Sequence, residues 1–213
     1  MYRLYGYKRW GSLAPQLTMD ELGVAYESRW AERAERQSEE YRRLNPLGLV
    51  PTLILPDGRA VFESSAIVAH LTETHDSEGR LAPRPGTPDH ALYLAWLTFL
   101  TAEIYATINA AEFVEDPGAL PLDDKATQAT LARAIREKVL GLFDIVERHL
   151  GESGGFMLGP TLGAADLYLM MLTLWAKPSP EALHARAPRI AGVVEAVKAR
   201  PALAKTLREH ELL

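Results

Sequence analysis

The first third of the chain alternates between short apolar runs and stretches with helical spacing. Residues 2–7 form an aromatic-rich run that predicts a strand. Over residues 13–22 the apolar positions fall on or near one face of a helix, which Gly23 ends. Residues 24–30 alternate as a second strand, and residues 31–43 are polar and predicted to be partly helical.

A hairpin and a helix complete this first unit. Two apolar runs, residues 49–55 and 59–62, flank Asp57-Gly58, and Asp-Gly between apolar runs is a strong short-range hairpin signal. Ser64-Ser65 then opens an apolar-faced helix over residues 66–74. The order β-α-β-α-β-β-α predicts an α/β unit with a small mixed sheet covered by helices.

The rest of the chain is predicted to be all-α. Residues 77–87 have the Pro, Gly and charge content of a linker, so we expect one domain over residues 1–76 and a helical one over residues 88–213. Residues 164–175 are almost wholly apolar, which predicts the buried central helix of that domain. The other helices are expected over residues 89–112, 123–150, 188–200 and 201–209.

Composition and charge exclude several partners. Of 213 residues, 47% are hydrophobic and 24% charged, and the formal net charge is −5 at pH 7. An acidic balance offers no general attraction for nucleic acid or for an anionic membrane, so neither is expected as a partner. The start of the sequence lacks the apolar core of a signal peptide, and no uninterrupted apolar run approaches ~18 residues. We therefore expect a cytoplasmic protein.

The sequence contains no cysteine. Its absence excludes a disulfide framework, a thiolate metal site, an iron–sulfur cluster and a cysteine nucleophile. The six histidines are scattered without ligand spacing, so no metal site is expected. Any thiol chemistry therefore needs a thiol that arrives with a substrate or cofactor.

Pro51 stands at the entrance of a predicted strand, where a residue without an N–H group needs a special reason. One such reason is a cis Val50–Pro51 peptide bond. That geometry would leave the N–H and C=O groups of Val50 free to pair with an extended, peptide-like ligand. The alternative is an ordinary proline at a sheet edge.

A second candidate lies where the hairpin meets the next helix, at Glu63-Ser64-Ser65. The N-terminus of a helix offers free backbone N–H groups and positive potential, which suit a carboxylate. Glu63 beside it would hold an ammonium group, so the pair would grip the zwitterionic end of an amino acid. The alternative is a plain serine N-cap followed by ordinary helix.

Together these segments resemble the glutathione transferase family. The resemblance rests on Asn45-Pro46-Leu47-Gly48-Leu49-Val50-Pro51-Thr52-Leu53 and Phe62-Glu63-Ser64-Ser65-Ala66-Ile67. It extends over the whole chain, and the segments 81–83 and 96–103 look most like bacterial beta-type members. The resemblance implies a thioredoxin-like N-terminal domain, a helical-bundle C-terminal domain, glutathione as substrate and a homodimer.

The resemblance also implies residue roles for glutathione binding. Val50 would pair its backbone with the cysteinyl unit beside a cis Pro51, while Glu63 and Ser64 would hold the γ-glutamyl ammonium and carboxylate. Leu49 stands where the family often has a basic residue for the glycyl carboxylate. The counterpart of Glu103 in beta-like members can reach glutathione at the subunit interface, and the same is expected here.

Activation of the thiol is the least determined role. The thiolate is the nucleophile, so the enzyme must stabilise the anion and lower the thiol pKa. In a beta-like alignment the family's cysteine position falls on Gly11, followed by Ser12, whose hydroxyl at the start of a helix is the first candidate donor. Tyr5 and Tyr7 on the first strand are the alternatives.

The resemblance implies an electrophile pocket between the domains, with Trp10, Tyr105 and Asn109 as candidate lining residues. We therefore expect a glutathione transferase that attacks small apolar electrophiles, as in detoxification. One alternative keeps glutathione as a cofactor, in an isomerase of maleyl-type acids or an enzyme that cleaves aryl ethers. Another is a non-catalytic binding protein with the same fold.

Overall fold

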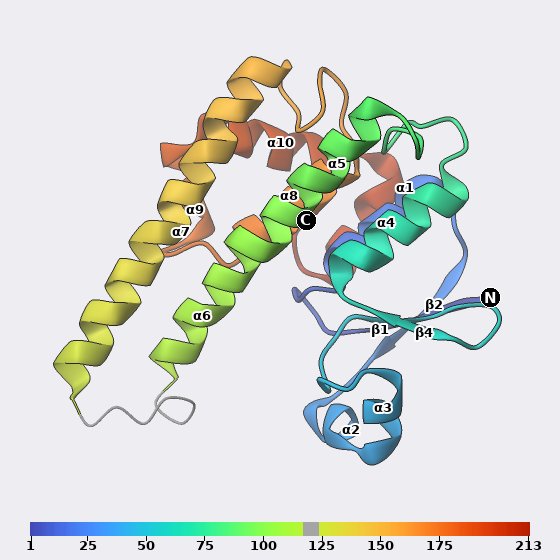
Figure 1. Cartoon of the computed structure of the whole chain (residues 1–213), viewed down its shortest axis with the longest axis horizontal. Coiled ribbons are helices and arrows are strands. Elements are labelled where there is room, and N and C mark those ends of the chain that lie inside the picture. The colour runs from blue at the N-terminus through green and yellow to red at the C-terminus, as the bar shows by residue number, and fades with distance from the viewer. Residues whose placement is uncertain (117–123) are drawn as a thin grey trace.

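A four-stranded mixed sheet forms the centre of the N-terminal part of the computed structural model, which describes residues 1–116 and 124–213 (Figure 1). The strand order is β2-β1-β3-β4. Strand β1 pairs in parallel with β2 and antiparallel with β3, and β3 and β4 form the predicted hairpin. The strands are β1 (Tyr2–Gly6), β2 (Tyr26–Trp30), β3 (Thr52–Ile54) and β4 (Ala60–Phe62).

Helices cover both faces of this sheet (Figure 1). On one face α1 (Leu13–Leu22) and α4 (Ser64–His75) pack against each other and bury Leu4 and Leu53. On the other face lie the short helices α2 (Arg33–Gln37) and α3 (Glu39–Leu44). Because side chains alternate along a strand, Tyr5 points away from Leu4 and packs with Tyr41. The α/β prediction is confirmed.

The second part of the chain is helical, as predicted. The completely buried α8 (Ala164–Thr173) lies at its centre. Helix α8 packs against α5 (Pro88–Phe99), the π-helical stretch η1 (Leu100–Tyr105) and α10 (Pro188–Lys198). The other elements of this part are α6 (Ala106–Glu115), α7 (Lys125–Ser153), α9 (Pro180–Arg186), the 3-10 turn η2 (Pro201–Leu203) and α11 (Ala204–Glu209). The predicted first residue of the helix over 123–150, Asp123, lies outside the described residues.

Two features of this part were not predicted from the sequence. Helix α9 follows Ser179, whose hydroxyl accepts a hydrogen bond from the backbone N–H of Ala182. The π-helical stretch η1 joins α5 and α6 without a break, and Tyr105 is its last residue. Neither has a clear hydrophobic signature, because α9 is short and a π turn differs from an α turn only in its hydrogen-bonding register.

The continuous helix from Pro88 to Glu115 contains a longer apolar stretch than the sequence analysis expected. By length and composition alone it could cross a membrane. In the structure α5 packs against α8 and α6 packs against α7. One side of the helix therefore packs on the other helices of this part, while 28% of its apolar window is buried.

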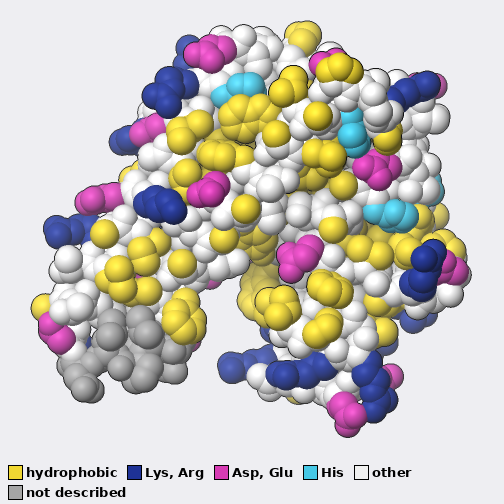
Figure 2. All heavy atoms as spheres, in the orientation of Figure 1, with side chains coloured by type: hydrophobic (Ala, Val, Ile, Leu, Met, Phe, Trp, Pro, Cys, Tyr) yellow, Lys and Arg dark blue, Asp and Glu magenta, His cyan; other side chains and the backbone are white. Residues whose placement is uncertain are grey.

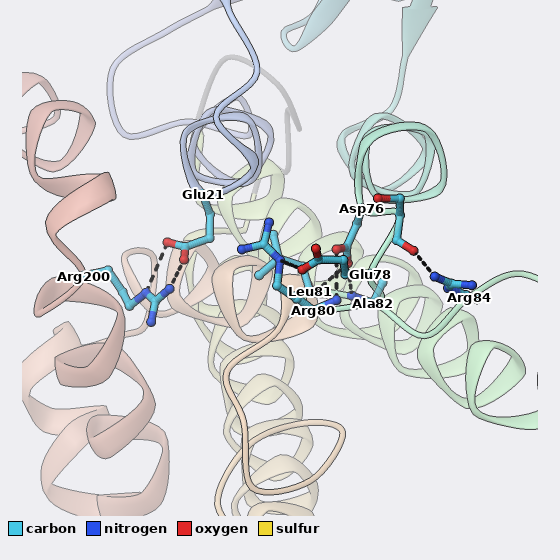
Figure 3. A network of polar contacts seen from close by, with 9 residues as sticks. Glu21, Asp76, Glu78, Arg80, Leu81, Ala82, Arg84 and Arg200 are labelled. Atoms are coloured by element: carbon cyan, nitrogen blue, oxygen red, sulfur yellow. Dashed lines mark hydrogen bonds and ion pairs between the residues drawn. The ribbon is translucent and has the colours of Figure 1, made fainter.

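The segment between the two parts is held by Asp76 (Figure 3). Its buried carboxylate accepts backbone hydrogen bonds from Arg80 at 2.9 Å, Leu81 at 2.6 Å and Ala82 at 3.0 Å. Elsewhere in this network Glu21 of α1 pairs with Arg200, which precedes η2. Asp76 therefore fixes the first half of the linker, and the Glu21–Arg200 ion pair ties the first part to the helical part.

The N-terminus of α8 packs directly against the same segment. The backbone N–H of Ala164 donates to the carbonyl of Leu81 at 2.8 Å, and a Cβ placed on Gly163 would lie 2.7 Å from that oxygen. Gly163 is therefore required by the close approach of Leu81. The buried Asp166 carboxylate accepts the N–H groups of Gly163 at 2.8 Å and Met157 at 2.9 Å.

The C-terminal segment docks beside the start of α1. The fully buried His210 accepts a hydrogen bond at Nδ1 from the backbone N–H of Arg9 (2.9 Å), so its Nε2 donates to Oε1 of Gln16 (2.8 Å). Burial, and next the charges of Lys8 and Arg9, lower the pKa of His210 to about 4. The neutral imidazole thus fixes the loop that precedes α1.

Candidate functional site

Two adjoining cavities lie between the sheet domain and the helices η1 and α6. Figure 2 shows a hollow between the arm formed by α6 and α7 and the lobe formed by α2 and α3. The first cavity, of about 400 Å³, is lined by Asn45, Leu47, Leu49, Val50, Pro51, Glu63, Ser64, Thr101, Ala102, Tyr105, Ala106 and Asn109. The second, of about 500 Å³, is lined by Trp10, Leu49, Val50, Tyr105, Asn109, Glu112 and Trp175.

The Val50–Pro51 peptide bond is cis, as predicted. The carbonyl oxygen of Leu49 is already occupied, because it accepts from the Tyr41 hydroxyl at 2.8 Å and from the Asn45 amide at 2.9 Å. Within residues 1–116 and 124–213, by contrast, the N–H and C=O groups of Val50 have no hydrogen-bond partner. Hydrogen bonds therefore fix the backbone of this loop at Leu49, while the backbone groups of Val50 remain available to a ligand.

The N-terminus of α4 forms the other polar wall of the first cavity. The backbone N–H groups of Ser64, Ser65 and Ala66 precede the first bond of the helix, which Ile67 N–H makes to the Glu63 carbonyl. Glu63 has a positive φ of 71° and an exposed side chain. The buried Ser64 hydroxyl lies 2.7 Å from the Tyr168 hydroxyl of α8.

Comparison with known proteins identifies the family. The glutathione S-transferase N-terminal domain model matches residues 12–74, and the corresponding C-terminal domain model matches residues 118–210. A glutathione S-transferase-like protein from Beauveria bassiana is 31% identical over 205 residues, which cover 89% of this chain and 86% of the relative. The chain belongs to the glutathione S-transferase family.

Solved structures show the same fold. A glutathione transferase from Methylococcus capsulatus has a TM-score of 0.80 and 26% identity, with both chains completely covered. A sphingomonad glutathione S-transferase in complex with glutathione has a TM-score of 0.79 and 24% identity over 99% of this chain and 100% of that one. The fold is thus a thioredoxin-like domain followed by a helical domain. The likeness to beta-type members stays a prediction.

The structure gives the Ser12 hydroxyl a structural role. The side chain is completely buried, and its Oγ donates to the carbonyl of Tyr7 at 3.1 Å and accepts from the Tyr7 N–H at 3.2 Å. A Cβ on Gly6 would lie 2.5 Å from this Oγ, so the serine fills the space that Gly6 leaves. Ser12 lines neither cavity. The expectation that it activates a thiol has no geometric support.

Tyr5 and Tyr7, the alternatives to Ser12, also lie outside the two cavities. Tyr5 is buried against Tyr41, with ring centroids 5.5 Å apart, and the Arg29 guanidinium lies over its ring. Tyr7 packs on Trp10 at 5.0 Å and lines a separate hollow at the end of the sheet. Neither phenol is positioned to meet a ligand that pairs with Val50.

The predicted lining residues of the electrophile pocket do come together. Trp10, Tyr105 and Asn109 all line the second cavity, although they come from a loop, η1 and α6. Trp175 completes the wall and stacks on Tyr105, with ring centroids 5.0 Å apart and an angle of 16° between the planes. Glu112 of α6 adds a carboxylate that the sequence analysis did not assign to a pocket.

Glu103 is the one predicted glutathione contact that does not line either cavity of this chain. It is exposed on η1, and its carboxylate lies 3.9 Å from the ammonium group of Lys138 on α7. A contact of Glu103 with glutathione therefore needs a site in a second subunit, and it stays a prediction.

Proposed function

We propose that this protein binds glutathione in the first cavity and directs its sulfur to attack an electrophile in the second. The observation that carries the proposal is the backbone of Val50, which has no partner among the described residues and lines the same cavity as Glu63 and the N-terminus of α4. Glutathione is an extended peptide with a zwitterionic γ-glutamyl end. Such a ligand needs one free strand edge and one carboxylate–ammonium site, and both kinds of group line this cavity.

The cysteinyl and γ-glutamyl parts of glutathione each have a counterpart in the cavity. The cysteinyl unit would pair with the N–H and C=O groups of Val50. The γ-glutamyl carboxylate would accept from the N–H groups at the start of α4, helped by the helix dipole, and the ammonium group would meet Glu63. Among the described residues that line the cavity there is no cation, so the glycyl carboxylate lacks an ionic partner.

The second cavity favours apolar electrophiles. Trp10, Tyr105 and Trp175 supply aromatic walls, and Glu112 is its only charged lining residue in the part of the chain that the structure describes. A carboxylate repels a dianionic substrate, so the maleyl-type isomerase is disfavoured. The two cavities share Leu49, Val50, Tyr105 and Asn109. A sulfur held at Val50 would therefore directly face an electrophile bound in the second cavity.

The decisive experiment measures binding and turnover separately. Calorimetric titration with glutathione should show one site per chain, and a panel of aryl halides and epoxides should consume one glutathione per product formed. Absence of binding would refute the proposal. Binding without reaction on any electrophile would favour the non-catalytic alternative, and product formation without net consumption of glutathione would favour the isomerase.

We also propose that the protein is a cytoplasmic homodimer. Several large apolar side chains are exposed outside the cavities, including Phe62 on β4 and Leu92 on α5, which are 39% and 57% exposed. Burial of such side chains in a second copy would remove apolar surface from water. Light scattering should give twice the chain mass of 23.6 kDa, and a monomer mass would refute the dimer.

A further inference from the structure

The hydroxyl group of Tyr105 reaches across the boundary between the two domains. A Cβ placed on Gly11 would lie 2.7 Å from Tyr105 Oη and 3.3 Å from Cδ of Pro51. The phenol oxygen therefore lies beside the residue that precedes Ser12 and close to the cis proline. Gly11 leaves room for it, since any larger residue at this position would displace the phenol.

This hydroxyl has no hydrogen-bond partner within residues 1–116 and 124–213. Its position is nevertheless well determined, because the ring stacks on Trp175 and the residue ends the π-helical stretch η1. A π turn often occurs at functional sites, where the extra residue re-aims a side chain. The structure therefore holds a phenol rigidly and leaves its oxygen open to a ligand.

Other hydroxyl groups near the shared wall are already engaged. Ser64 lies against Tyr168, Thr101 donates to the carbonyl of Leu97 at 2.8 Å, and Ser12 is bonded to Tyr7. Tyr105 lines both cavities, next to the Val50 backbone that would hold the cysteinyl unit. Burial raises the pKa of Tyr105, so the phenol keeps its proton and can donate it in a hydrogen bond.

We propose that the Tyr105 hydroxyl is the catalytic hydrogen-bond donor to the sulfur of bound glutathione, an inference that rests on the proposed function. The thiol proton passes to water, and the phenol retains its own proton while its O–H donates to the thiolate. The sulfur then forms a bond to the electrophilic carbon, and the displaced group leaves with its bonding electron pair. The helical domain thus supplies the group that stabilises the anion.

The first test replaces Tyr105 by Phe, which keeps the ring and its stacking on Trp175. A charge-assisted hydrogen bond corresponds to a change of about 10- to 100-fold in the ionisation of the thiol. In Tyr105→Phe the pKa of bound glutathione, followed by thiolate absorbance, should rise by about 1–2 units. Turnover near neutral pH should fall by a similar factor and recover at alkaline pH, while the Kd for glutathione changes less than about 2-fold.

Tyr26→Phe is the matched control. Tyr26 lies on β2, away from both cavities, and its hydroxyl bonds Asp20 at 3.2 Å. The control should leave the thiol pKa unchanged. An unchanged thiol pKa in Tyr105→Phe overturns the inference. If the unaltered protein binds no glutathione, the proposed function fails instead, so the two failures are distinguishable.

A double-mutant cycle tests the contact itself. Gly11→Ala puts a methyl group where the phenol oxygen lies, so it should raise the thiol pKa of bound glutathione by displacing Tyr105. In the Tyr105→Phe background the oxygen is gone, and Gly11→Ala should have almost no further effect. Effects that simply add would show that Tyr105 does not act from beside Gly11, and they would overturn the inference.

Discussion

The two halves of the candidate site are built in different ways. In the first cavity the groups proposed to meet glutathione are largely backbone groups, at Val50 and at the start of α4, and they come from two segments of one domain. In the second cavity the groups are side chains, and Trp10, Tyr105 and Trp175 are distant in sequence. One half therefore depends on backbone geometry, and the other on how helices and aromatic rings pack.

This difference explains why the first cavity could be predicted from the sequence. A backbone site needs a proline at a strand entrance and a helix start, and both leave local signals. A side-chain site needs particular distances between elements, which no local pattern encodes. Substitutions should therefore affect the two halves separately, and the loop before α1 should link them, because it carries Trp10 and Gly11.

The largest expected effect concerns that loop and depends on pH. The pKa of His210 is lowered to about 4 in the folded protein against 6.5 when unfolded, so the unfolded chain binds the extra proton first. Stability should be fully present above pH 6.5 and should fall by on the order of 3 kcal/mol as pH drops towards 4. Denaturant unfolding across this range measures it.

His210→Gln removes the titrating group and should flatten this pH dependence. His70→Gln, which replaces a histidine on α4 outside both cavities, is the matched control. It should leave the pH dependence intact. Identical acid sensitivity in His210→Gln and the unaltered protein would assign the effect to another group.

Glu63→Gln should weaken the first half alone. Loss of a charge-assisted contact to the γ-glutamyl ammonium should raise the Kd for glutathione by about 10- to 100-fold. The turnover number at saturating glutathione should stay nearly constant, because the second cavity is unaltered. Glu40→Gln, an exposed glutamate on α3, is the control, and equal Kd values in the two variants would remove Glu63 from the site.

Trp175→Leu should weaken the second half alone. The variant removes an aromatic wall and the stacking partner of Tyr105, so kcat/KM for aromatic electrophiles should fall by about 10-fold, the size expected of an aromatic contact. The Kd for glutathione, measured by calorimetry, should be unchanged. A parallel loss of glutathione affinity would mean that the two cavities are not separable.

Leu49→Lys should have the smallest effect, and it should strengthen glutathione binding rather than weaken it. Leu49 is 49% exposed at the edge of the first cavity, where the lining has no cation among the described residues. An ammonium group there should meet the glycyl carboxylate and tighten glutathione binding by about 2- to 5-fold, the strength of an exposed ion pair. The gain should shrink in high salt, and a salt-independent change would point to another cause.

The order of elements in the N-terminal domain could be predicted, and so could the buried helix α8, because hydrophobic periodicity and turn residues encode both. The cis Val50–Pro51 bond could also be anticipated, since proline there lacks a ladder donor. The π turn at Tyr105 and the short helix α9 could not, because neither changes the apolar pattern enough to be seen.

The contrast between Ser12 and Tyr105 shows where sequence reasoning stops. Alignment places Ser12 next to the family's activating position, but alignment carries no information on which partner a hydroxyl finds. Gly6 lets the Ser12 hydroxyl turn inward to the Tyr7 backbone, and Gly11 leaves space that Tyr105 occupies from the other domain. Both outcomes depend on atoms brought together by folding.

The sequence by itself determined the fold class, the two-part organisation and the absence of any protein thiol, since these follow from periodicity, turn chemistry and composition. It also located the backbone groups of the first cavity. Only the tertiary structure decided which hydroxyl faces the shared wall of the two cavities. The physical reason is that a hydrogen-bonding group satisfied inside the fold is lost to a ligand, and that satisfaction depends on contacts between residues far apart in the chain.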